Sequence, residues 1–252
     1  MTWISRDDAW PSSELSAGPA SDLPQLIVPA YFHPAAHLDL WRQIAAHAAN
    51  IRLVVLNVAN GPGMTPNPDF DGVLELLRKA GIAVAGYVDT NYGQRPAEAA
   101  LADTQRFLNW YDVAGMFFDR VAVGPEQLDY YATVARRSRD LGAGTVVFHH
   151  GAHPLEAYAE HADVIGTFEG PWESYLRLAV PRWTRSRPAG TFYHVVYSVP
   201  SEHAADAYLL ATRRQAGCAY ITDRGGDNPY DRLPAWGLAP DGPWHMGRGR
   251  GD

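Results

Sequence analysis

The chain has 252 residues, of which 46% are hydrophobic and 19% are charged, and its formal net charge is −7. This composition is typical of a globular protein with a large core, and the negative charge argues against a partner held through nucleic-acid phosphates. No run reaches the ~18 apolar residues that a membrane span needs. Asp7, Asp8 and Glu14 interrupt the N-terminal stretch, so we expect no secretion signal and a cytoplasmic location.

Short apolar runs rich in β-branched and aromatic residues recur along the chain and predict strands. They lie at residues 26–31, 53–57, 82–88, 115–119, 145–148, 163–168, 192–197 and 218–222. Amphipathic stretches that predict helices follow the first seven, at residues 37–48, 69–80, 96–111, 125–141, 154–161, 172–178 and 202–215. Asp69 is the expected N-cap of the second helix and Gly81 its stop.

This alternation of near-continuous apolar strands with helices predicts a parallel sheet that is covered by helices. Eight such units predict a single (β/α)8 TIM-like barrel, with a doubly wound open sheet as the alternative. We expect an irregular lead-in at 1–24, the barrel at 25–238 and a flexible tail at 239–252. We expect no cofactor and no metal. Residues 61–63 (GPG) make too short a loop to hold a phosphate. The sequence does not indicate an oligomeric state.

Two of the predicted strands end in a carboxylate, Asp119 and Glu169. In a parallel barrel the C-terminal strand ends converge on the face where chemistry takes place, so these two are the expected catalytic pair. Aromatic and polar side chains at the other strand ends suit a small molecule or an oligosaccharide. The expected substrate-binding residues are Tyr31, His33, Asn57, Asn60, Tyr87, Asp89, Tyr92, Arg95, Arg120, His149, Trp172 and Tyr197.

Several of these residues also have a structural interpretation. Asn57 and Asn60 could brace the neighbouring turn, and Asp89 could serve loop geometry or orient an arginine. Tyr92 and Trp172 are more often walls of a site than catalysts. His149 and His150 are adjacent in a strand and should point to opposite faces, which argues against a shared metal.

The segments at these strand ends together resemble the spherulin 4-like family. They are residues 29–34 (PAYFHP), 57–63, 86–93 (GYVDTNYG), 115–119 (GMFFD), 162–169 and 197–200. The resemblance implies a TIM-like barrel and a retaining endo-glycosidase that acts on galactosamine-containing polysaccharides. It further implies that Asp119 is the nucleophile and Glu169 the acid/base.

Three positions depart from the family pattern. The family has Glu where this chain has Arg120, Asn-Pro-Gly where it has residues 149–151 (HHG), and Asn-Pro where it has residues 57–58 (NV). An arginine beside Asp119 is expected to keep that carboxylate ionised. Aromatic residues around Glu169 are expected to raise its pKa.

Three functions follow from these observations. The first is retaining hydrolysis of an amino-sugar glycan by Asp119 and Glu169. The second is a cytoplasmic biosynthetic enzyme on the same barrel, in which Glu169 or a histidine acts as the base and Arg120 orients an acidic substrate. The third is a carbohydrate-binding barrel without catalysis.

Overall fold

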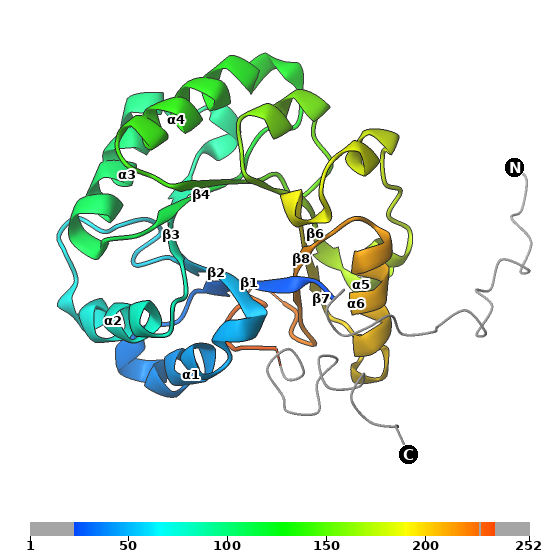
Figure 1. The fold of residues 1–252 in the computed structure, drawn as a ribbon, viewed down its shortest axis with the longest axis horizontal. Coiled ribbons are helices and arrows are strands. Elements are labelled where there is room, and N and C mark those ends of the chain that lie inside the picture. Colours follow the sequence, from blue (N-terminus) through cyan, green and yellow to red (C-terminus); the bar gives the residue numbers. More distant parts are fainter. Residues whose placement is uncertain (1–22, 227, 235–252) are drawn as a thin grey trace, which may run out of the picture.

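The chain forms a closed, eight-stranded parallel barrel in a computed structural model that describes residues 23–226 and 228–234. Neighbouring strands in the sequence are neighbours in the barrel, and β8 pairs with β1 to close it (Figure 1). The strands are β1 Gln25–Ala30, β2 Ile51–Leu56, β3 Val84–Asp89, β4 Gly115–Asp119, β5 Thr145–His149, β6 Val164–Pro171, β7 Phe192–Tyr197 and β8 Cys218–Ile221. The predicted fold is therefore confirmed.

Helices cover the outside of the barrel, as Figure 1 shows. The α-helices are α1 Pro34–Ala46, α2 Asp71–Lys79, α3 Ala97–Tyr111, α4 Leu128–Asp140, α5 Trp172–Leu176 and α6 Ala204–Arg213. Gly86 on β3 lets α3 pack closely, because a Cβ there would lie 2.4 Å from the Phe107 ring. Each helix buries its apolar face against the barrel, and this burial stabilises the helix.

Some predicted boundaries were wrong. The segment predicted as a helix at 154–161 contains only a 3-10 helix, η6 Glu156–Glu160, because it has too few residues for an α-helix before β6 begins. Asp69 is not an N-cap; the side chain of Asn67 accepts the hydrogen bond that begins η3 Pro68–Phe70 ahead of α2. The tail predicted at 239–252 and nearly all of the lead-in lie outside the described residues.

An aromatic layer crosses the inside of the barrel below the C-terminal strand ends. Tyr87 stacks with Phe117, with ring centroids 6.5 Å apart, and Phe117 stacks with His149 at 5.4 Å. On the opposite side, the Tyr193 ring lies 5.7 Å from His149 and its hydroxyl donates to the Ile27 carbonyl at 3.2 Å. Residues just above this layer reach the open end of the barrel, where Asp89 and Asp119 are register partners.

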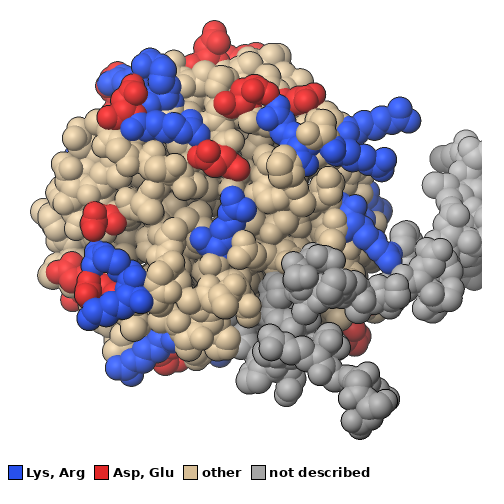
Figure 2. Space-filling model, viewed as in Figure 1, with Lys and Arg blue, Asp and Glu red and all other residues tan. Residues whose placement is uncertain are grey.

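Charged residues of both signs are interspersed over most of the face shown in Figure 2, while blue side chains alone gather along its right edge. Among the described residues, no helix has both the length and the apolar character to span a bilayer.

Candidate active site

Asp119 ends β4 and is fixed by the end of β3. The Tyr87 hydroxyl donates a hydrogen bond to Asp119 Oδ2 at 2.9 Å. The Thr90 hydroxyl, which is fully buried, donates to the Asp119 carbonyl at 2.8 Å. The carboxylate of Asp119 is therefore held by a residue of β3, and its backbone by the residue directly after β3.

Glu169 lies on β6 and interacts with the end of β5. His149 Nε2 lies 2.6 Å from Glu169 Oε2, and the Tyr230 hydroxyl donates to Oε1. The His149 side chain is only 6% exposed, whereas that of Glu169 is 35% exposed. One carboxylate oxygen thus faces a buried imidazole and the other faces a tyrosine from the segment after β8.

Gly166 makes room for this arrangement. A Cβ on Gly166 would lie 2.0 Å from His149 Nδ1 and 2.9 Å from Cε1. Only glycine therefore allows the imidazole to lie flat against β6 and direct Nε2 toward Glu169. Nδ1 is buried and has no hydrogen-bond partner among the described residues.

The two carboxylates have opposite pKa shifts. Burial raises the pKa of Asp119, and the charge of Glu169 raises it further, although the charge of His149 opposes both. Burial also acts to raise the pKa of Glu169, but the hydrogen bond and charge of His149 outweigh it and the pKa is lowered. Both carboxylates therefore interact with the same histidine, and the charge of Glu169 also acts on Asp119.

These directions are the reverse of the sequence-based expectation. Arg120 turns away from Asp119, and its guanidinium binds Asp89 Oδ2 at 2.9 Å and Asn91 Oδ1. It also lies over the Tyr92 ring, with Cζ 5.1 Å from the centroid. The expectation that the charge of Arg120 keeps Asp119 ionised was wrong. The guanidinium pairs with Asp89, only the backbone N–H of Arg120 bonds to Asp119, and burial outweighs this bond.

Tyrosine rings surround the carboxylates at the open end of the barrel. Tyr31, after β1, makes edge-to-face contacts with Tyr87 at 5.6 Å and with Tyr230 at 5.5 Å. Such rings can cover the apolar face of a sugar while the carboxylates act on its polar groups. Trp172 is instead 7% exposed and stacks on His203, which makes it a packing residue at the start of α5. Tyr197 ends β7 and is half-buried.

Three other residues expected to bind substrate have structural roles in a helix end or a turn. His33 is the N-cap of α1, and its Nδ1 accepts from the Ala35 amide at 3.2 Å. Asn57 Oδ1 accepts from the Gly61 amide at 3.0 Å, and Asn60 occupies the same turn with a φ of 54°. Each of these contacts satisfies a backbone group of a turn or a helix end.

Asp89 and Arg95 brace the loop after β3. Asp89 Oδ1 accepts from the Asn91 amide at 2.7 Å, and Arg95 donates to the Asp89 carbonyl at 3.0 Å. Arg95 also pairs with Asp103 on α3 at 2.5 Å. Asp89 thus has the contacts expected of a residue that serves loop geometry or orients an arginine, and its role in substrate binding stays a prediction.

His149 and His150 point to opposite sides of β5, as the strand alternation predicts. His150 Nδ1 lies 2.7 Å from the Ala122 carbonyl, and burial lowers its pKa to about 3. Its Nε2 is buried without a partner among the described residues. Within the same residues, no group of three or more His, Cys, Asp or Glu side chains is arranged to hold a metal ion.

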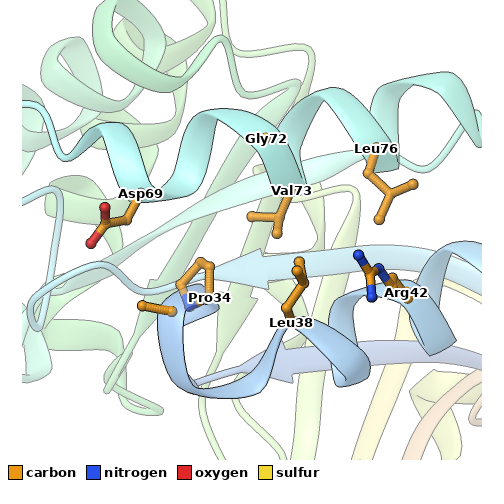
Figure 3. Close-up of a pocket in the computed structure, with 8 residues that line it drawn as sticks. Pro34, Leu38, Arg42, Asp69, Gly72, Val73 and Leu76 are labelled. Atoms are coloured by element: carbon orange, nitrogen blue, oxygen red, sulfur yellow. The ribbon is translucent and has the colours of Figure 1, made fainter.

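A separate groove of about 460 Å³ lies between α1 and α2 on the outside of the barrel. Leu38 of α1 faces Val73 and Leu76 of α2 across it (Figure 3). Asp69 is the one carboxylate in its described lining, which includes neither Asp119 nor Glu169. The groove is therefore distinct from the candidate active site.

The model of spherulation-specific family 4 matches residues 25–237, which include all eight strands. The chain belongs to this family. It is also 25% identical over 211 residues to Spherulin-4 of Physarum polycephalum, a match that covers 79% of this chain and 63% of that protein. This member of spherulation-specific family 4 thus spans less than two thirds of the length of its curated relative.

Solved structures share the barrel of this family member. Sph3 of Aspergillus clavatus, crystallised in complex with GalNAc, matches with a TM-score of 0.74 and 22% identity over 88% of this chain and 97% of that one. A deoxyribose phosphate aldolase from Aeropyrum pernix matches with a TM-score of 0.52 and 17% identity over 82% and 88%. At these identities the comparisons show a common fold.

Two residues near the carboxylates were missed by the sequence analysis. Tyr230 lies nine positions after the end of β8, and Tyr193 lies inside β7, so neither is at a predicted strand end. Inward alternation along β7 could have indicated Tyr193. No pattern in the sequence indicates Tyr230, because its position depends on how the segment after β8 folds back over the barrel.

Proposed function

We propose that this protein is a glycoside hydrolase that uses Asp119 and Glu169 to cleave a glycan containing an N-acetylated amino sugar. The observation that carries the proposal is the carboxylate pair from β4 and β6, which interacts with one buried histidine inside a ring of tyrosines. Membership of spherulation-specific family 4 and the GalNAc bound to Sph3 support an amino-sugar substrate.

The chemistry requires one ionised and one protonated carboxyl. In a retaining mechanism the carboxylate attacks the anomeric carbon while the acid gives its proton to the leaving oxygen, so one C–O bond forms as the glycosidic bond breaks. A water then attacks the anomeric carbon, its proton passes to the second residue, and the ester bond breaks. The opposite pKa shifts of Asp119 and Glu169 suit this division between acid and nucleophile.

The test is hydrolysis of GalNAc oligomers by the wild type and by Asp119→Asn and Glu169→Gln. We expect each variant to lose a factor on the order of 10³ in kcat/KM, since each removes a group that reacts. Asp140→Asn is a matched control, because this carboxylate lies on the exposed surface of α4 and pairs with Arg136. NMR of the first product should show the anomeric configuration of the substrate.

The outcomes separate the three functions considered. A rate that is unchanged in Asp119→Asn or Glu169→Gln would remove that residue from the catalytic pair. Tight binding of the oligomers without turnover would instead support a carbohydrate-binding barrel. Neither turnover nor binding of oligomers would favour the small-molecule enzyme.

A further inference from the structure

The two carboxylates of the pair are hydrogen-bonded unequally. Both oxygens of Glu169 face a side-chain donor, His149 on Oε2 and Tyr230 on Oε1. Asp119 receives the Tyr87 hydroxyl on Oδ2 and the backbone N–H of Arg120, which are both neutral donors. A donor that can carry a charge favours the ionised form of a carboxylate more than a neutral donor does, so His149 distinguishes Glu169 from Asp119.

His149 adds a charge to this difference. Glu169 faces it from β6 and Asp119 from β4, and the rings of Phe117 and Tyr193 enclose it. Burial acts to lower the pKa of His149, but the hydrogen bond and charge of Glu169, followed by the charge of Asp119, raise it overall. Nε2 of His149 is therefore directed at Glu169, and the two carboxylates favour the protonated form of the imidazole.

We propose that His149 and Tyr230 are positioning residues that keep Glu169 ionised as the nucleophile, and that Asp119 carries the catalytic proton. This inference rests on the proposed function and assigns the two roles in the order opposite to the one that the family resemblance implies. The family pattern has asparagine at position 149 and glutamate at position 120. His149 acts on Glu169 through both a hydrogen bond and its charge, whereas it acts on Asp119 through its charge alone, and Arg120 is paired to Asp89.

In this assignment an oxygen of Glu169 attacks the anomeric carbon, and Asp119 gives its proton to the leaving oxygen as the glycosidic bond breaks. Asp119 is then ionised and takes a proton from the water that attacks the anomeric carbon, and the bond to Glu169 breaks. Glu169 is again a carboxylate and Asp119 again an acid. His149 keeps its proton throughout and does not touch the substrate.

The first test measures protonation directly and needs no substrate. Side-chain ¹³C and ¹⁵N NMR titrations from about pH 3 to about pH 9 would follow Asp119, Glu169 and His149 in the full chain. We expect Asp119 to titrate above Glu169, and His149 to titrate above its ordinary 6.5. His150 should stay neutral over most of the range and serves as an internal reference.

His149→Asn is the decisive variant, because asparagine keeps a donor for Glu169 but removes the charge. We expect the Glu169 pKa to rise by about one unit in this variant. In Glu169→Gln we expect the His149 pKa to fall by a similar amount. A Glu169 that titrates above Asp119 in the wild type, or that does not respond to His149→Asn, would overturn the proposal.

The second test assigns the roles by leaving group. With a dinitrophenyl glycoside the leaving group needs little protonation, so Asp119→Asn should regain much of its lost rate while Glu169→Gln should not. The reverse pattern would overturn the assignment and leave glycosidase activity established. If no glycoside is cleaved, the proposed function fails, and the NMR titrations still decide the protonation order.

Discussion

At the scale of the residue, position 166 decides where His149 can lie. The imidazole of His149 occupies the space that a Cβ on residue 166 would fill, and its Nδ1 lies 2.0 Å from that Cβ position. A methyl group there would push the ring away from β6 and would disturb its bond to Glu169. Replacement of a family asparagine by a histidine thus depends on a glycine on the neighbouring strand.

We expect Gly166→Ala to lower the free energy of unfolding by about 1–3 kcal/mol, as is usual for overpacking. It should also reduce turnover, because His149 moves relative to Glu169. Urea unfolding would measure the change in stability, and steady-state kinetics would measure the change in turnover. Gly72→Ala is the control, since nothing lies within 4 Å of its Cβ position on α2 and alanine there should stabilise the helix by up to ~1 kcal/mol. Equal effects of the two variants would contradict this steric argument.

At the scale of the element, His33 connects the start of α1 to the segment ahead of α2. Its Nδ1 accepts from the Ala35 amide, and its Nε2 lies 3.4 Å from Asn67 Nδ2 and 3.7 Å from Asp69 Oδ2. These contacts belong to the ends of two outer helices. The same position directly after β1 made His33 look like a substrate ligand in the sequence.

We expect His33→Ala to lower the free energy of unfolding by about 0.5–2 kcal/mol, because it removes an N-cap. His33→Asn should restore most of this loss, since asparagine is a good capping residue. Thermal unfolding and steady-state kinetics on the same variants would check the assignment. A large rise in KM for His33→Ala with unchanged stability would contradict the capping role and would indicate that His33 binds substrate.

At the scale of the whole molecule, the barrel closes through the pairing of β1 with β8. Gln25 pairs with Cys218 and Leu26 with Ala219, and the Gln25 amide donates to the Gly217 carbonyl at 3.0 Å. Cys218 is the one cysteine of the chain and is fully buried at this seam. Burial raises the pKa of its thiol to about 11. Both effects keep the thiol unreactive while the barrel is closed.

We expect a disulfide reagent to label Cys218 on the order of 10³-fold more slowly in the native protein than in the unfolded chain. As denaturant is added, labelling should rise together with the loss of circular dichroism, because the seam opens only when the barrel unfolds. Cys218→Ala should incorporate no label. Fast labelling under native conditions would show that β8 separates from β1 without global unfolding.

The sequence by itself determined the barrel and the order of its eight strands, and it singled out Asp119 and Glu169, which the structure places at the end of β4 and within β6. These are local properties, since hydrophobic periodicity and turn residues depend on neighbours along the chain. Only the tertiary structure decided the partners of each charged group: Arg120 with Asp89, His149 and Tyr230 with Glu169. A pKa depends on what surrounds a group in space, and residues 61 positions apart, such as Glu169 and Tyr230, meet only after the barrel has closed.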